Sequence, residues 1–435
     1  MAMPEMLEWT RRIGYKASDF NKLNIIHVTG TKGKGSTCAF TQSILMQYQK
    51  EIPKIGLYTS PHLKSVRERI RINGQPIAEE LFTKYFFEVW DSLSSSQSNE
   101  TEFPHMGSDI KPMYFKYLTL LSFHVFMKEG VNTAIYEVGV GGEFDSTNII
   151  EQPTAAGVSA LGIDHTFMLG NTITEIAWNK GGIFKKGAKA FSVSQEADAM
   201  KVLEERATER NTELTVVDED AVNGYKIGIP GTFQRQNAAL AVALSTEHLK
   251  KLNIEVDDSK TSKGLETTFW PGRCQIIKED KINWYIDGAH TKESVDASSG
   301  WFKSVTDPKR KRVLLFNQQT RDANALVTRL FDGVSPLKFD EVIFTTNVTW
   351  SSGKYSADLV SMNTSKDAVD KLEVQKELAD EWAKLDPKSN RNVFHDIESS
   401  IKYIRSLEDQ NLDVFVCGSL HLVGGFLVVL EGEDA

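Results

Sequence analysis

The chain has 435 residues, of which 40% are hydrophobic and 25% charged, and its formal net charge is −9. This length predicts two or three domains, and the composition is that of an ordinary globular protein. The acidic balance argues against nucleic acid as a partner, because binding a phosphate backbone needs an extended basic face. The three cysteines lie far apart and form no CxxC pair, which favours reduced thiols over a disulfide framework.

Nothing in the sequence indicates a membrane or a secreted protein. No apolar run reaches the length of a membrane span. The first residues, MAMPEMLEW, have the features of neither a signal peptide nor an Arg-rich transit peptide. We therefore expect a cytoplasmic protein that binds no membrane, with a mitochondrial form carrying a presequence as the open alternative.

Apolar runs alternate with amphipathic stretches, which is typical of a largely parallel sheet flanked by helices. Strands are expected at residues 24–28, 54–59, 133–138, 155–159, 190–192 and 284–287, and a second set at 312–317, 341–346 and 413–419. A buried aromatic helix is expected at 114–126, and a mobile surface insertion at the Ser-rich stretch 92–111. The fold class predicted is α/β: a P-loop NTPase-like, mostly parallel sheet domain at 1–299, then a smaller Rossmann-like α/β domain at 300–435.

The first motif in chain order is HVTGTKGKGST, residues 27–37, which follows an apolar strand. Gly30, Gly33 and Gly35 permit backbone angles closed to other residues, so successive N–H groups can point at an anion. The N-terminus of the helix expected from Ser36 adds a partial positive charge, and Lys34 adds a full one. The spacing is shorter than the common P-loop, but a nucleoside triphosphate site is favoured over a plain glycine turn.

Candidate magnesium ligands follow two further strands. Glu137 ends the strand 133–138 and has apolar neighbours, which disfavours a surface or capping role. An acid at the end of a strand beside a P-loop strand is where such enzymes hold Mg²⁺ or its water. Ser60 follows another strand end, and Ser36 or Thr37 offers a further hydroxyl.

Other charged residues become functional candidates only when they are considered together with the neighbouring motifs. Asp164-His165 follows a strand, and Lys180 precedes a Gly-Gly turn. His165 alone is more often an ordinary polar residue, and Lys180 alone a solvated lysine. Arg67 belongs to an alternating run of arginines that in most proteins is a solvated face.

Near the expected domain boundary, two short motifs each place one charge beside glycine. Arg273 lies in WPGR and Asp287 in DGAHT. Each motif alone is a weak signal.

Together these motifs resemble the folylpolyglutamate synthase family of the Mur ligase superfamily. The matching segments, in the family's order, are GTKGKGST, TSPHL with RERIRING, EVGVGG-x-x-D-x-TN, GIDHT-x-x-LG, KGGI, WPGR, DGAHT and GSLHLVGG. They cover nearly the whole chain, and the short P-loop is the form this family uses. The resemblance implies an ATP-dependent ligase that adds L-glutamate to the γ-carboxylate of folate polyglutamates through an acyl phosphate, in one-carbon metabolism.

The resemblance also assigns residues, motif by motif. The catalytic residues implied are Lys34, His165 and Lys180, a lysine that is carbamylated in many members. The ATP site implied comprises Gly30, Thr31, Lys32, Gly33, Lys34, Gly35, Ser36, Thr37, Asn237, Arg273 and Asp287. The Mg²⁺ ligands implied are Ser60, Glu137 and His165, and a monovalent cation is a further expectation. Folate is expected near Tyr114, Phe115, Phe144, Asp145 and Ser146, and the charge around Arg67 suits its glutamate tail.

The expected partners are therefore a reduced folate, L-glutamate and ATP, bound by a monomer. The nearest alternative is dihydrofolate synthase, which attaches the first glutamate to dihydropteroate. Lys116 stands where bacterial bifunctional relatives tend to have an acid, and this leans away from that alternative. A P-loop switch that ligates nothing is the alternative from another class. The WPGR and DGAHT motifs argue against it, because a cleft that closes over ATP needs such residues near the domain boundary.

Overall fold

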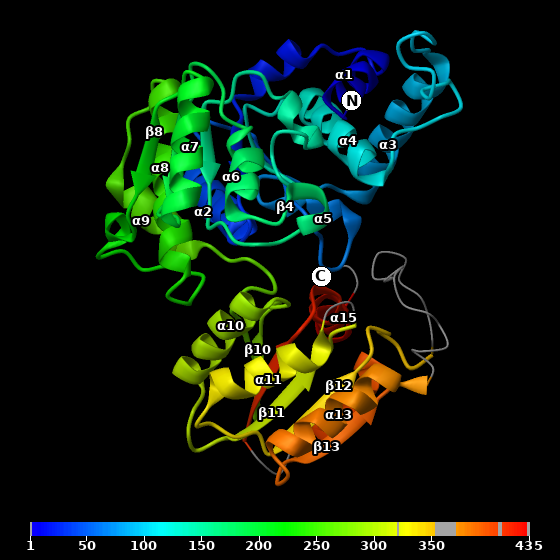
Figure 1. Cartoon of the computed structure of the whole chain (residues 1–435), viewed down its shortest axis with the longest axis vertical. Coiled ribbons are helices and arrows are strands. Elements are labelled where there is room, and N and C mark those ends of the chain that lie inside the picture. Colours follow the sequence, from blue (N-terminus) through cyan, green and yellow to red (C-terminus); the bar gives the residue numbers. More distant parts are fainter. Residues whose placement is uncertain (1, 320–321, 353–370, 408–410, 433–435) are drawn as a thin grey trace. The chain divides into compact units, whose positions relative to one another are not determined.

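The structure is a computed structural model, and it describes residues 2–319, 322–352, 371–407 and 411–432. The chain divides into two compact units, each built on its own sheet (Figure 1). The first unit comprises Met1–His62, Arg67–Gly228 and Gln234–Phe269. The second comprises Leu63–Val66, Ile229–Phe233 and Trp270–Ala435. None of the helices within the described ranges is long and apolar enough to cross a bilayer.

The first unit contains an eight-stranded sheet of order β4-β3-β2-β5-β1-β6-β7-β8. Its strands are β1 (Ile26–Thr29), β2 (Ile55–Tyr58), β3 (Ile70–Ile72), β4 (Gln75–Pro76), β5 (Thr133–Glu137), β6 (Ala155–Val158), β7 (Lys189–Val193) and β8 (Leu214–Val217). All neighbours are parallel except β2–β3 and β3–β4. The central strand β1 is buried along its whole length, as parallel strands covered on both faces are.

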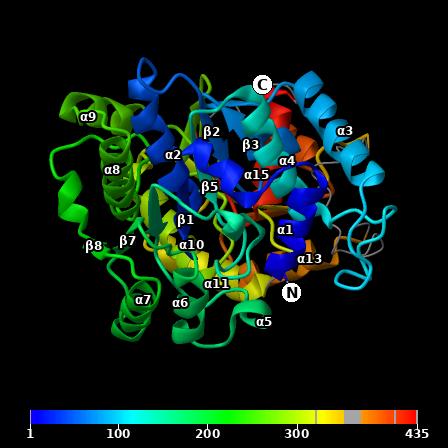
Figure 2. The ribbon, with the colours of Figure 1, turned by 90° about the horizontal axis from the view of Figure 1, so that it is seen from above.

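Helices of the first unit cover this sheet. They are α1 (Ala2–Arg12), α2 (Lys34–Leu45), α3 (Glu79–Ser95), α4 (Tyr114–Glu129), α5 (Thr166–Leu169), α6 (Ile173–Gly181), α7 (Ala197–Glu209), α8 (Gln234–Lys251) and α9 (Asp258–Thr267). Short 3-10 turns are η1 (Ala17–Leu23), η2 (Met46–Tyr48), η3 (Val66–Arg69), η4 (Ser146–Ile149) and η5 (Glu219–Val222). The helix that follows the P-loop, α2, packs against α8 and α9 (Figure 2).

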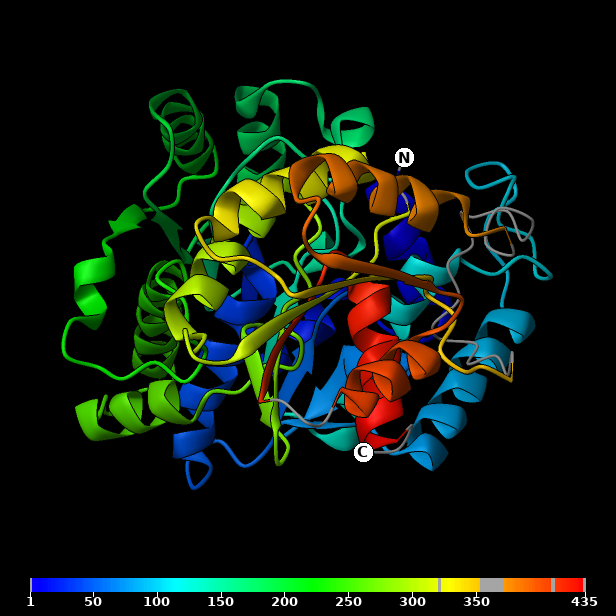
Figure 3. The ribbon, with the colours of Figure 1, turned by 90° about the horizontal axis from the view of Figure 1, so that it is seen from below.

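The second unit contains a six-stranded sheet of order β13-β12-β11-β14-β10-β9, in which only β9 is antiparallel. Its strands are β9 (Gln275–Lys278), β10 (Ile282–Ile286), β11 (Lys311–Phe316), β12 (Glu341–Thr345), β13 (Asn390–Phe394) and β14 (Leu412–Cys417). Its helices are α10 (Lys292–Val305), α11 (Ala323–Val334), α13 (Glu373–Leu385), α14 (Ile397–Ser406) and α15 (Leu420–Glu431). Figure 3 shows α14 and α15 on one face of this sheet and α11 with α13 on the other.

The predicted α/β class with a second, smaller sheet domain is confirmed, and every expected strand is present with small shifts at its ends. The expected boundary near residue 300 is wrong. Strands β9 and β10 precede that residue yet hydrogen-bond into the second sheet, and the compact units divide between Phe269 and Trp270. The DGAHT turn joins β10 to α10 inside the second unit and does not link the two.

The Ser-rich stretch 92–111, expected as a mobile insertion, is anchored to the first unit. Its first residues continue α3 to Ser95. The buried guanidinium of Arg12 donates hydrogen bonds to the carbonyls of Leu93, Ser96 and Met106, the last two at 2.9 and 3.0 Å. One arginine thus satisfies carbonyls from both sides of the stretch.

Candidate active site

The glycine-rich turn between β1 and α2 is fixed by its own surroundings. The N–H groups of Thr31 and Lys32 donate to the carbonyl of Ala160, at 2.9 and 3.0 Å. The hydroxyl of Ser159 donates to the carbonyl of Lys32 at 2.7 Å. Thr31 and Lys32, both expected at the nucleotide, therefore direct their amides at the loop after β6. The amides that remain for an anion are those of the first turn of α2, which have no intrahelical acceptor.

Gly33 and Asn237 are in close contact at this turn. Gly33 has a φ of +87° and is the N-cap of α2. A Cβ atom added there would lie 2.1 Å from Oδ1 of Asn237, which is buried on α8. Only glycine fits, because both the backbone angle and the space exclude a side chain. The structure thus brings Asn237, expected at ATP, to the P-loop.

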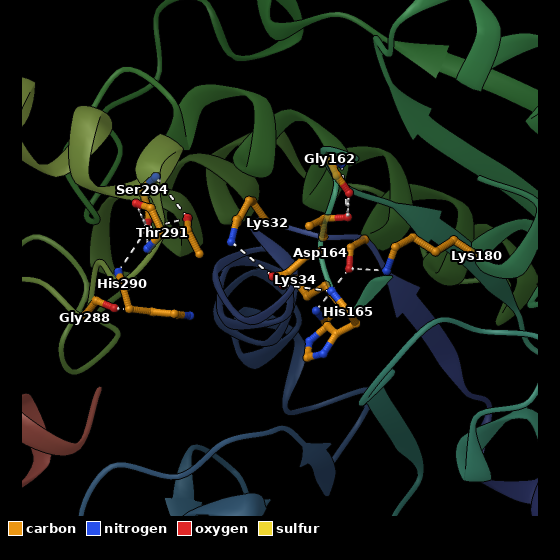
Figure 4. A network of polar contacts seen from close by, with 12 residues as sticks. Lys32, Lys34, Gly162, Asp164, His165, Lys180, Gly288, His290, Thr291 and Ser294 are labelled. Carbon is orange, nitrogen blue, oxygen red and sulfur yellow. Dashed lines mark hydrogen bonds and ion pairs between the residues drawn. The ribbon is translucent and has the colours of Figure 1, made fainter. Parts of the chain in front are cut away.

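Two lysines, Lys34 and Lys180, both labelled in Figure 4, donate to the carbonyl of Gly30. Nζ of Lys34 lies 3.1 Å from it, and Nζ of Lys180 lies 2.8 Å from it. Lys180 is only 3% exposed, so the solvated-lysine alternative is wrong. Burial, together with the positive charge of Lys34, holds the pKa of Lys180 well below its usual range. An amine with a lowered pKa is readily neutral and nucleophilic.

The candidate magnesium ligands are only partly brought together. Glu137 is buried at the end of β5, and its Oε2 accepts the backbone N–H of Ser60 at 3.0 Å. These residues meet because β2 and β5 are adjacent and parallel. His165 is exposed at the N-cap of α5, where its N–H bonds Asp164, which also pairs with Lys32. In the described parts of the chain, no group of three or more His, Cys, Asp or Glu side chains is arranged to hold a metal.

The two segments expected at folate meet in the first unit. Tyr114 and Phe115 form the exposed first turn of α4, and Ser146 follows β5. The hydroxyls of Ser146 and Thr119, which is on α4, lie 3.0 Å apart. An exposed aromatic surface therefore borders a polar loop, as a flat heteroaromatic ligand requires.

Arg69, which the motif comparison did not single out, is an arginine at these rings. Its guanidinium carbon lies 5.5 Å from the ring centre of Phe115 and 5.8 Å from that of Tyr114. Arg69 is buried and donates to Nδ1 of His62 at 2.9 Å, so the solvated-face reading is wrong for it. Arg67, the arginine that was expected near folate, donates to the backbone carbonyl of Ile77 at 3.2 Å.

Trp178 was missed by sequence reasoning. Its ring lies 6.3 Å from that of the exposed Phe144, and the guanidinium of Arg206 lies 4.5 Å from it. A lone tryptophan on a helix carries no motif, which explains the omission. Lys116 stands where bacterial bifunctional relatives tend to have an acid. In the structure its Nζ lies 2.6 Å from Oε2 of Glu5 on α1.

Arg273 and Asp287 belong to the second unit. The Asp287 carboxylate is buried and accepts the N–H of Cys274 at 2.9 Å. Burial raises the pKa of Asp287, and the charge of Arg273 opposes that rise. In the turn that follows, His290 contacts Gly288 and Ser294 (Figure 4). Binding of ATP by Arg273 and Asp287 stays a prediction.

Comparison with known proteins agrees with this geometry. Residues 272–429 match the family model described as "Dihydrofolate synthetase, C-terminal domain". Curated proteins named folylpolyglutamate synthase from the Saccharomyces cerevisiae strains FostersO and AWRI796 are 59% identical over 449 residues, covering 100% of this chain and 82% of each relative.

Solved structures share the fold. A Mycobacterium tuberculosis folylpolyglutamate synthase complexed with ADP matches with a TM-score of 0.78 at 21% identity, covering 98% of this chain and 94% of that one. Escherichia coli FolC in complex with DHPP and ADP matches with a TM-score of 0.72 at 25% identity, covering 99% and 94%. With identity of 59% along its whole length to the yeast proteins, the chain belongs to the folylpolyglutamate synthase family.

Proposed function

We propose that this protein is an ATP-dependent ligase that adds L-glutamate to the γ-carboxylate of a reduced folate polyglutamate. The observation that carries the proposal is the P-loop turn, with Lys34 and Lys180 on the carbonyl of Gly30 and Asn237 against Gly33. In the same unit, Thr119 and Ser146 join the exposed aromatic turn of α4 to the loop after β5. Relatives named folylpolyglutamate synthase, and solved neighbours complexed with ADP, support the same reading.

The chemistry fits a site that positions charge. A carboxylate is a poor electrophile, so its oxygen first attacks the γ-phosphorus of ATP, giving an acyl phosphate and ADP. The neutral amine of glutamate then attacks the acyl carbon, loses a proton, and phosphate leaves with its bonding electrons. Phosphoryl transfer depends on alignment and charge neutralisation, which Lys34 and the N-terminus of α2 supply.

Magnesium would be held at Glu137 and Ser60, because adjacent oxygen donors at strand ends are the ligands it prefers. When bound, it would neutralise charge on the phosphates. His165 remains a predicted ligand, and a monovalent cation remains a prediction without a described site.

Lys180 has the properties needed for carbamylation. Its lowered pKa favours the neutral amine, whose lone pair attacks the carbon of CO₂ and forms an N–C bond with loss of one proton. The product is an anion where an ammonium stood. Near a phosphate-bound metal, an anion orients ligands while an ammonium repels the cation.

One assay tests the function. The protein is incubated with ATP, labelled glutamate, and either a tetrahydrofolate or dihydropteroate, and labelled amide products are separated. Label on tetrahydrofolate is expected. Label only on dihydropteroate would instead support dihydrofolate synthase, a candidate favoured by the description of the matching family model. No labelled product with either acceptor would support the P-loop switch.

A further inference from the structure

The strand that carries the P-loop also holds the loop after β5, through two buried side chains. His27 and Thr29 lie two residues apart on β1, so both point to the same face of the sheet, and both are 0% exposed. The hydroxyl of Thr29 donates to the carbonyl of Gly141 at 2.6 Å. Nε2 of His27 lies 2.8 Å from Oγ1 of Thr147. The loop between Glu137 and Thr147 is thus attached to β1 at two points.

The hydrogen bonds of Thr147 fix the protonation of His27. The single hydroxyl proton of Thr147 is donated to Oδ1 of Asp145 at 2.6 Å, so the hydroxyl accepts a proton from His27. His27 is therefore the tautomer with hydrogen on Nε2. Its Nδ1 is buried and has no hydrogen-bond partner among the described residues. Burial lowers the pKa of His27 to about 3, so the ring stays neutral at physiological pH.

Asp145, the end of this chain of bonds, spans the loop. Its Oδ1 also accepts the N–H of Thr147 at 3.0 Å, and its Oδ2 accepts the N–H of Val140 at 3.0 Å. A carboxylate offers about four acceptor positions, and these bonds take three. The orientation of the carboxylate is therefore set by the loop and by the hydroxyl that His27 holds.

We propose that His27 is a positioning residue for folate, which acts through Thr147 to orient the Asp145 carboxylate in the loop that carries Phe144 and Ser146. The inference rests on the proposed folate role of that loop. A leucine or phenylalanine would fill the same space without burying an unpaired acceptor, so simple packing does not account for a histidine here. Because β1 runs directly into Gly30, the same strand sets both the phosphate turn and the folate loop. Transfer between two bound reactants needs such a fixed relation.

The same sheet provides a matched control. His248 on α8 is also 0% exposed, and it also bonds threonine hydroxyls, in its case two: those of Thr133 at 2.9 Å and Thr154 at 2.7 Å. Burial lowers its pKa to about 4. Thr133 begins β5 and Thr154 precedes β6, so His248 lies at the N-terminal ends of these strands, away from the loop. Like His27, His248 is expected to stabilise the fold. Unlike His27, it has no proposed role in positioning folate.

The test compares matched variants by thermal unfolding and by KM for the reduced folate and for ATP. His27→Leu is expected to raise the folate KM about tenfold, the effect of one lost buried hydrogen bond, with the ATP KM changed less than about twofold. His27→Gln keeps an N–H donor at position 27, and Thr147→Ser keeps the hydroxyl at position 147. Both variants should therefore retain most of the folate affinity of the wild type. His248→Leu should lower the melting temperature as His27→Leu does, with both KM values unchanged.

Two outcomes would overturn the proposal: equal kinetic effects of His27→Leu and His248→Leu, or a parallel rise of both KM values. If His27→Leu does not fold, Thr147→Val keeps the packing, removes the hydroxyl, and must give the same selective loss of folate affinity. The double variant His27→Gln/Thr147→Val should be no worse than Thr147→Val alone, because both act through one hydroxyl.

Asp145→Asn separates this inference from the function it rests on. If Asp145→Asn leaves the folate KM unchanged, the folate assignment of the loop fails. If Asp145→Asn raises the folate KM and His27→Leu does not, only the role of His27 fails.

Discussion

Substitution of Gly33 by alanine tests the geometry of the phosphate turn. The residue has a φ of +87°, and its Cβ would lie 2.1 Å from Oδ1 of Asn237. That amide is buried and donates its Nδ2 to Oε1 of Gln234 at 2.9 Å. Alanine at position 33 therefore destabilises the folded protein in two ways. Its backbone angle is unfavourable, and its Cβ displaces a hydrogen-bonded side chain.

The magnitude follows from these two effects. A left-handed backbone costs an L-residue about 1–2 kcal/mol. Loss of the buried hydrogen bond of Asn237 adds about 1–3 kcal/mol, so Gly33→Ala should lower the free energy of unfolding by about 2–5 kcal/mol. Gly14 is the matched control, because its φ is +89° and no atom lies within 4 Å of its added Cβ. Gly14→Ala should cost only the backbone part, about 1–2 kcal/mol.

Hydrogen exchange across a urea series, read at peptides from α2 and α8, measures both variants within the first unit. ATP affinity measured by calorimetry should fall for Gly33→Ala and be unchanged for Gly14→Ala. In an Asn237→Ala background the clash is absent, and Gly33→Ala should then cost no more than Gly14→Ala. If the two alanine variants are equally unstable in the wild-type background, Asn237 does not contact Gly33 in solution and the reasoning is refuted.

Further predictions concern single side chains. Lys34→Ala should abolish ligation in the glutamate-incorporation assay with an unchanged melting temperature; near-native turnover would contradict its phosphate role. Lys180→Ala should be inactive but partly rescued by a short carboxylic acid, and bicarbonate depletion should slow the wild type; rescue by a small amine would contradict carbamylation. The folded pKa of His248, about 4, lies below its ordinary value of 6.5, so its contribution to stability is complete above pH 6.5 and lost as pH falls toward 4. That loss is about 3 kcal/mol, and denaturant unfolding of His248→Gln should be less sensitive to acid over this range.

Strands and local motifs were predictable because their signals are local. Runs such as those of β1, β5 and β14 are apolar and lie between glycine-rich or polar turns. The missed strands are short or at the edges of the sheets: β3, β4, β8, β9 and β13. The domain boundary failed for a related reason, because strand pairing between β10 and β14 joins residues more than a hundred positions apart.

The environment of individual side chains was not predictable from sequence. The burial of Lys180 depends on the carbonyl of Gly30, which lies 150 positions earlier. The fit of Asn237 against Gly33 likewise joins distant segments. Residue type and motif therefore suggested candidate groups for the site, but not their protonation or their partners. Arg69 illustrates this, because its charge suggested solvent and the fold buries it against aromatic rings.

The attachment of Thr31 and Lys32 to the carbonyl of Ala160 has a thermodynamic consequence for nucleotide binding. Ordering a flexible turn costs about 1–2 kcal/mol of conformational entropy per residue. Here the turn is already ordered in the folded protein, so this loss of conformational entropy does not reduce the affinity for the nucleotide. A preformed turn also removes an ordering step from the encounter with ATP. Ordering of the turn therefore contributes little to the association rate.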